Sequence, residues 1–106
     1  MSAIEDRGNV QEAQFVLDAA KEFKAEAIRN KALGHWAAGL MAKSDAEAEA
    51  YALEVIKSDM EEAGDDDVFR KLRGDLTAAN CEITDEAIRA RMAVELKAAR
   101  DEVYGG

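Results

Sequence analysis

The chain has 106 residues and a formal net charge of −9 at pH 7. Its lack of proline, with 48% hydrophobic and 35% charged residues, is typical of an all-helical domain. The negative charge opposes binding to nucleic acid, the single cysteine excludes an internal disulfide, and no apolar run approaches the ~20 residues of a membrane span.

The first expected element is one long helix. Asn9 followed by Glu12 resembles a capping box, and the helical pattern continues from there to about Ala42. Such a helix would span about 50 Å, which the rest of a chain of this size cannot cover. We therefore expect that the helix bends at Gly34 or Gly39, or that its N-terminal part projects from a bundle.

This helix carries one broad apolar stripe, which predicts packing against other helices. The stripe consists of Phe23, Ala27, Asn30, Leu33, Ala37, Leu40 and Met41. Lys24, Arg29 and Lys31 lie off it. A second apolar face, which consists of Val10, Leu17 and Ile28, leaves apolar groups for a partner.

Three more helices are expected, because each later segment has a start signal and one apolar face. Ser44 and Glu47 form a capping box, Gly64 is expected to end the second helix, the carboxylates at 65–67 open the third, and Thr84 caps the last. The expected inner faces are Ala48, Ala52, Val55, Ile56 and Met60, then Val68, Phe69, Leu72, Leu76 and Ala79, then Ile88, Met92, Leu96, Ala99 and Val103. The sequence thus predicts an all-α, four-helix bundle with a long, partly projecting first helix.

Six acidic residues lie among the nine positions from Asp59 to Asp67. A calcium loop of the EF-hand type needs ligands at fixed alternating positions and a distal glutamate, and this run has neither. Capping of helix ends and solvation therefore explain the run better than a metal site does.

His35 and Cys81 are the only histidine and the only cysteine. They do not complete a zinc site, and a nucleophile–base pair would need them to meet in the fold. We interpret His35 as a surface or partly buried polar side chain and Cys81 as a small, semi-buried apolar one. Without an acid–base cluster, no enzyme activity and no cofactor are expected.

Lys21, Lys24, Arg29 and Lys31 give the long helix a locally basic surface. A nucleotide phosphate could lodge at Lys24, Arg29 and Lys31, although no glycine-rich phosphate loop is present. A solvated face that balances an acidic protein is the favoured alternative.

Three stretches together form a specific pattern. They are Phe23-Lys24 through Arg29-Asn30-Lys31, Leu33-Gly34 and Trp36-Ala37-Ala38; Ala48 to Ala52, running on to Val55 and Asp59; and Glu61 to Lys71. In combination they resemble the zeta subunit family, which consists of small inhibitors of the F-type ATP synthase in alpha-proteobacteria.

The resemblance implies a function for the N-terminus. Within one domain, residues 1–20 would be a mobile inhibitory segment, and residues 21–106 would be the bundle that presents it. The segment would bind the catalytic head of the synthase at an interface of the α and β subunits, near the γ subunit, and block ATP hydrolysis. The implied contact residues are Ile4, Asp6, Arg7, Val10, Gln11, Gln14 and Phe15. The resemblance also implies a free monomer in the cytoplasm that becomes peripheral to the inner membrane when bound, without inserting into it.

Four positions in this segment depart from the family pattern. Gly8 stands where a helix-forming residue is usual, Ile4 and Gln11 stand where an aromatic is usual, and Gln14 replaces a lysine. Each change removes helix propensity, apolar area or positive charge. The alternative is therefore the same fold with weak or lost inhibition, acting as a synthase-associated or nucleotide-binding helical module.

Overall fold

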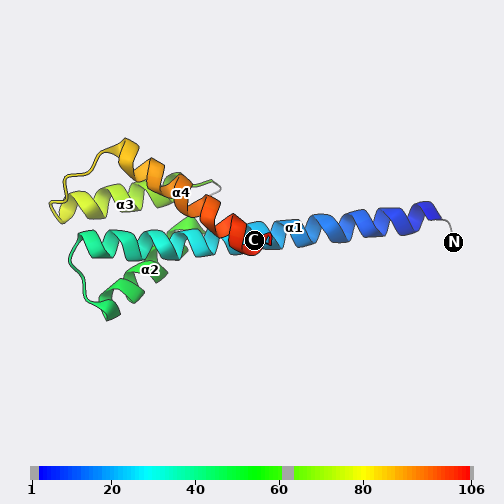
Figure 1. The fold of residues 1–106 in the computed structure, drawn as a ribbon, viewed down its shortest axis with the longest axis horizontal. Coiled ribbons are helices and arrows are strands. Elements are labelled where there is room, and N and C mark those ends of the chain that lie inside the picture. Colours follow the sequence, from blue (N-terminus) through cyan, green and yellow to red (C-terminus); the bar gives the residue numbers. More distant parts are fainter. Residues whose placement is uncertain (1–2, 61–63, 106) are drawn as a thin grey trace.

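The computed structural model describes the backbone of residues 3–60 and 64–105 and the side chains of residues 19–60 and 64–105. Within these ranges it contains four helices and no strand: α1 (Ala3–Leu40), α2 (Asp45–Asp59), α3 (Asp66–Ala78) and α4 (Asp85–Val103). With 38 residues, α1 is twice as long as α4, which has 19. The overall dimensions are 64 × 24 × 23 Å (Figure 1). The predicted all-α bundle with a long first helix is confirmed.

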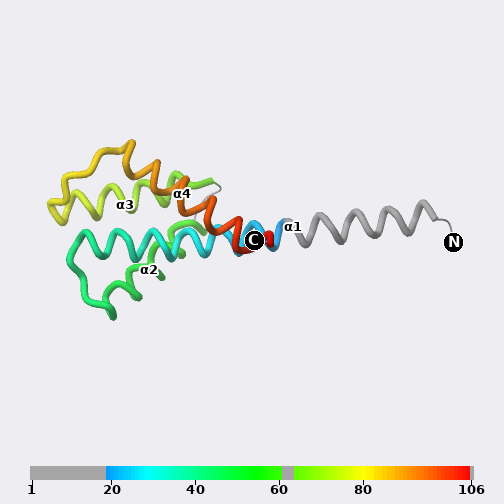
Figure 2. Tube along the Cα trace, in the orientation of Figure 1, coloured from blue at the N-terminus to red at the C-terminus, as the bar shows by residue number. Residues whose placement is uncertain are grey.

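The other three helices pack around the C-terminal half of α1 (Figure 2). Their apolar faces meet in one core, which contains Leu33, Ala37, Ala38, Tyr51, Val55, Val68, Leu72, Leu76, Ile88 and Met92. Trp36 and Met41 pack at its edge. The core depends on few large side chains, because several positions on α1 are alanine.

The predicted stripe on α1 is correct in its middle and wrong at its ends. Leu33 and Ala37 are fully buried, whereas Phe23 is 61% exposed and Leu40 is 46% exposed. Phe23 follows the exposed residues 19–21, where the cover of the bundle runs out, and Leu40 is the last residue of the helix. The helix itself is continuous through both glycines at which a bend was considered.

Glycine is required where α1 crosses α2. A Cβ atom placed on Gly34 would lie 2.5 Å from the Cα atom of Ala52 and 2.9 Å from its Cβ atom. No side chain fits this space, so the backbones approach closely only because Gly34 has none. A Cβ atom on Gly39 or Gly74 would meet nothing within 4 Å.

Two predicted helix starts are confirmed by their hydrogen bonds. The Glu47 backbone N–H donates to Ser44 Oγ at 3.3 Å, and the Ser44 N–H donates to Glu47 Oε1 at 2.8 Å, which is a complete capping box. At the start of α4, the backbone N–H of Ala87 donates to Thr84 Oγ1 at 3.1 Å. These ends are fixed by residues close together in the sequence.

The predicted end of the second helix is wrong. Helix α2 ends at Asp59, and Met60 is its C-cap, with its N–H donating to the carbonyl groups of Lys57 and Ser58. Gly64 does have a left-handed backbone, with φ of +88°, but it lies directly before the cap position of α3. This left-handed conformation therefore belongs to the turn that leads into α3.

The predicted inner faces of the last three helices are largely correct. Val55, Leu72, Leu76 and Ile88 are fully buried. Met60 and Ala79 are exposed, because each lies past the last residue of its helix.

Candidate functional site

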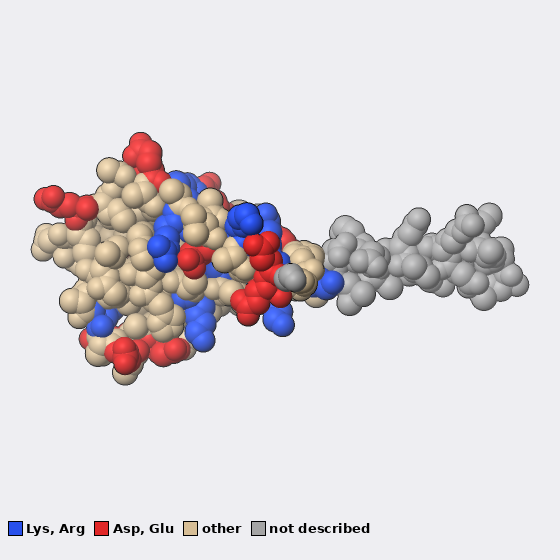
Figure 3. All heavy atoms as spheres, viewed as in Figure 1, with Lys and Arg blue, Asp and Glu red and all other residues tan. Residues whose placement is uncertain are grey.

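The base of the bundle is where residues 22–30 of α1 meet the C-terminal ends of α2 and α4. It directly follows residues 1–20, the segment for which the family resemblance implies a function. Charged groups of both signs gather here, at the end of α4 beside α1 (Figure 3). Three features define this region: a buried ion pair, a set of hydrogen bonds that clamps α1 to α4, and a carboxylate without an ion pair.

The buried ion pair joins α1 to the end of α2. Arg29 is only 3% exposed, and its Nη2 atom lies 3.5 Å from Asp59 Oδ2. Asn30 lies between the two groups: Arg29 Nε donates to Asn30 Oδ1 at 3.0 Å, and Asn30 Nδ2 donates to Asp59 Oδ2 at 3.0 Å. Buried charges need such partners, because an unpaired one is strongly destabilising. The expectation that Arg29 lies on an open basic surface is therefore wrong.

The clamp joins α1 to the end of α4. Arg100 Nε donates to Glu22 Oε1 at 3.0 Å, Arg100 Nη2 donates to the same oxygen, and the Tyr104 hydroxyl donates to Glu22 Oε2 at 3.2 Å. The hydrogen bond from Arg100 holds the pKa of Glu22 below its usual value. Lys21 lies 5.6 Å from the centre of the Tyr104 ring. The clamp holds α1 against α4 at the first turn of α1 whose side chains the structure describes.

The unpaired carboxylate belongs to Glu26. It is half-buried and makes no hydrogen bond or ion pair with another described side chain. Burial is the main cause that raises its pKa, and the nearby charge of Asp59 adds to the effect. Arg29 and Arg100 oppose this rise through their charges, but neither forms an ion pair with Glu26.

The structure separates the three residues proposed for a nucleotide phosphate. Lys24 and Lys31 are exposed, while Arg29 is buried in its ion pair. The predicted contact residues Ile4, Asp6, Arg7, Val10, Gln11, Gln14 and Phe15 lie outside the side chains that the structure describes.

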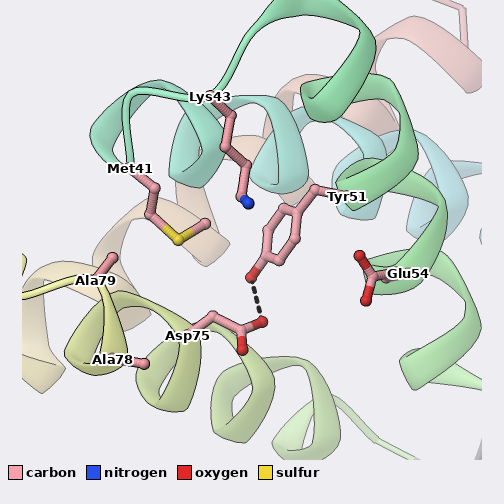
Figure 4. Close-up of a pocket in the computed structure, with 7 residues that line it drawn as sticks. All are labelled: Met41, Lys43, Tyr51, Glu54, Asp75, Ala78 and Ala79. Carbon is pink, nitrogen blue, oxygen red and sulfur yellow. Dashed lines mark hydrogen bonds between the residues drawn. The ribbon is translucent and has the colours of Figure 1, made fainter.

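A second region, between α2 and α3, is a cavity of about 350 Å³ lined by Met41, Lys43, Tyr51, Glu54, Asp75, Ala78 and Ala79 (Figure 4). The Tyr51 hydroxyl donates to Asp75 Oδ2 at 2.8 Å, and Lys71 Nζ lies 5.0 Å from the centre of the Tyr51 ring and 3.1 Å from Asp75 Oδ2. Burial raises the pKa of Tyr51, which therefore stays a neutral donor. Tyr51 is not among the core residues predicted from the sequence, although it lies one helical turn before Val55.

The acidic run is held by arginines. Arg89 binds Asp65 at 3.1 Å and Asp66 at 3.0 Å, and Arg70 binds Asp67. Asp65 occupies the cap position of α3, but its side chain makes no capping hydrogen bond, which corrects part of the expected explanation. Among the described residues, no group of three or more His, Cys, Asp or Glu side chains could hold a metal ion.

The two reactive side chains lie in ordinary surroundings. His35 is partly exposed, and its Nε2 atom lies 3.3 Å from Glu49 Oε1. Cys81 is semi-buried, and its thiol lies 3.3 Å from the carbonyl oxygen of Leu40. Both placements agree with the sequence interpretation.

None of the described helices has a stretch that is long and apolar enough to span a membrane.

Comparison with known proteins assigns the fold to a family. The family model described as ATPase inhibitor subunit zeta matches residues 1–102. A solution NMR structure of a protein is 43% identical in sequence, with a TM-score of 0.69, over 78% of this chain and 94% of that one. No match was found among curated protein sequences. The chain therefore belongs to the ATPase inhibitor subunit zeta family, and its general role is that of an ATPase inhibitor.

Proposed function

We propose that the protein binds the catalytic head of an F-type ATP synthase through residues 1–20 and blocks ATP hydrolysis. The segment enters an interface between α and β subunits, near the γ subunit, and obstructs rotation in the hydrolysis direction. Residues 21–106 are the bundle that presents it, in the manner of a helix that binds in a groove. In this proposal the protein has no catalytic step of its own.

One observation carries the proposal. The family match begins at residue 1 and runs to residue 102, so it spans the N-terminal segment together with the bundle. The described residues add support, because the clamp from Arg100 and Tyr104 to Glu22 lies two residues after this segment. Because the clamp fixes α1 at Glu22, the preceding segment would leave the bundle in one direction. This lowers the conformational entropy that is lost when the segment binds.

The alternative is a bundle with weak or lost inhibition. Gly8, Gln11 and Gln14 favour it, because each removes propensity, apolar area or charge from the proposed contact. A nucleotide-binding role is a further version of this alternative. It now rests on Lys24 and Lys31, since Arg29 is committed to Asp59.

The test is ATP hydrolysis by the cognate synthase head, measured with increasing amounts of the full-length protein, alongside direct binding to the immobilised head. The proposal expects binding and inhibition at the same protein concentrations. Binding without inhibition would support the alternative. If the protein neither binds the head nor inhibits it, both the proposed inhibition and the synthase-associated alternative are rejected. A nucleotide titration, followed by the NMR shifts of Lys24 and Lys31, would then test the nucleotide-binding alternative.

A further inference from the structure

Two large exposed apolar side chains, one from α1 and one from the C-cap of α2, line one groove at the base of the bundle. Phe23 is 61% exposed and Met60 is 65% exposed, and both line the groove together with half-buried Ala27 and Ile56. Leu53, also 61% exposed, lies on the same face of α2, because positions 53, 56 and 60 are one and two turns apart. A contiguous apolar strip of this kind marks a binding surface, whereas single exposed apolar residues do not.

The groove does not fit a small molecule. Its enclosed volume is about 20 Å³, whereas pockets for small ligands measure roughly 300–1,000 Å³. A shallow strip between two helices instead suits the side chains of a protein surface.

The charge of the groove defines the chemistry of the partner. Asp59 forms an ion pair with Arg29, whereas Glu26 lines the same groove and makes no hydrogen bond or ion pair with a described side chain. The charges of Arg29 and Arg100 act on Glu26 only at longer range. A lysine or arginine that lies along the apolar strip would bury its aliphatic stem there and bring its cation to Glu26. A second copy of this chain is disfavoured as the occupant, because each copy carries a net charge of −9.

We propose that this groove is a second docking surface, which binds an apolar surface of the ATP synthase head that carries a lysine or arginine. This inference rests on the proposed function. Phe23 comes three residues after the segment that we propose enters the head, so the rim of the entry site would reach the groove. The groove would add affinity that the segment with Gly8, Gln11 and Gln14 lacks.

The test uses full-length variants. Phe23→Gln with Met60→Gln removes the apolar strip while keeping residues that favour a helix, and Glu26→Lys reverses the groove charge. Val94→Gln is the control for apolar loss, because Val94 is 58% exposed on α4. Glu82→Lys is the charge control, in the exposed loop between α3 and α4 at the opposite end of the bundle (Figure 1). Thermal unfolding by circular dichroism confirms that each variant is folded.

The dissociation constant for the immobilised head is the main readout. We expect the double variant and Glu26→Lys each to bind about tenfold more weakly, and the controls to change by less than about twofold. Groove variants that bind within twofold of wild type would overturn the inference. Self-association in sedimentation velocity that the double variant abolishes would assign the groove to a second copy and would also overturn it.

Inhibition separates the two proposals. If wild type inhibits hydrolysis and the groove variants inhibit equally at every concentration, the proposed function stands and the docking surface is rejected. If wild type binds without inhibiting, the proposed function fails, and the ratio of dissociation constants still decides on the groove. A wild-type protein that does not bind the head overturns both.

Discussion

At the scale of single residues, the surroundings of Gly34 differ from those of Gly39 and Gly74. Gly34 is required by the contact with Ala52, whereas Gly39 and Gly74 face open space. Replacing glycine with alanine is therefore expected to lower the free energy of unfolding at Gly34 and to raise it at Gly74. This contrast could not be predicted from the sequence, because it depends on which helix crosses at that point.

The first prediction uses this contrast. Gly34→Ala should lower the free energy of unfolding by about 1–3 kcal/mol, because its Cβ atom would overlap the backbone of Ala52. Gly74→Ala should raise it by about 0.5–1 kcal/mol, because alanine favours the helix and meets nothing. Chemical unfolding of both variants measures the difference. Equal effects of the same sign would contradict the crossing.

The two glutamates at the base of the bundle should respond oppositely to pH. The pKa of Glu22 is lowered in the folded state, so its ionised form stabilises the fold above the ordinary glutamate pKa of 4.5, and this contribution is lost as pH falls through the folded pKa. The pKa of Glu26 is raised, so its ionised form disfavours the fold at neutral pH, and protonation relieves the cost.

The second prediction follows from these signs. At pH 7, Glu22→Gln should destabilise the protein and Glu26→Gln should stabilise it, each by less than about 1 kcal/mol because both groups are partly solvated. The Glu22→Gln difference should shrink as pH falls below 4.5, the value for the unfolded group, because the folded pKa lies below it. The Glu26→Gln difference should shrink at higher pH, as pH falls through the raised folded pKa toward 4.5. Urea unfolding at a series of pH values checks this. Differences that are independent of pH would show that the substitutions act through packing alone.

At the scale of whole helices, two C-terminal ends close in the same way. The Lys43 N–H donates to the Ala38 carbonyl at the end of α1, and the Cys81 N–H donates to the Leu76 carbonyl at the end of α3. Each motif needs one left-handed residue, here Ala42 with φ of 57° and Asn80 with φ of 62°. Asparagine tolerates this conformation, but alanine is strained in it.

The third prediction concerns that strain. Ala42→Gly should raise the free energy of unfolding by about 1 kcal/mol, because glycine adopts a positive φ without a steric cost. Ala46→Gly, in the first turn of α2, is the control and should lower stability. Thermal unfolding of the pair is sufficient. A destabilised Ala42→Gly variant would show that the turn is not left-handed in solution.

The fourth prediction tests the corrected face of α1. Leu33→Ala should cost about 2–5 kcal/mol, because Leu33 is fully buried. Leu40→Ala should cost less than about 1 kcal/mol, because Leu40 is 46% exposed. The original stripe predicted similar losses at both sites. Chemical unfolding that gives equal losses would restore it.

Local signals were sufficient to predict the four helices and two of their caps. Ser44 and Thr84 bond to groups three residues away, so their roles are written in short motifs. The prediction that Arg29 lies on the surface was wrong, because its burial depends on an ion pair with Asp59 of another helix. For the same reason, the sequence did not reveal the contact of Tyr51 with Asp75.

At the scale of the whole molecule, the proposal assigns different roles to the bundle and to the N-terminal segment. The bundle fixes α1 from two sides, through Asp59 at the end of α2 and Arg100 at the end of α4. The proposal makes residues 1–20 the part that acts on the synthase. It also predicts that amides up to about Ala20 exchange faster than those between Phe23 and Met41.

The central claim is tested most directly by ATP hydrolysis by the synthase head, with wild type and two variants at equal concentration. One variant lacks residues 1–16. The other carries Gly8→Ala, Gln11→Phe and Gln14→Lys, which restore helix propensity, apolar area and charge. The account predicts that the deletion abolishes inhibition, with α2–α4 still folded by circular dichroism, and that the restored variant inhibits more strongly than wild type. A deletion variant that inhibits as well as wild type would contradict it.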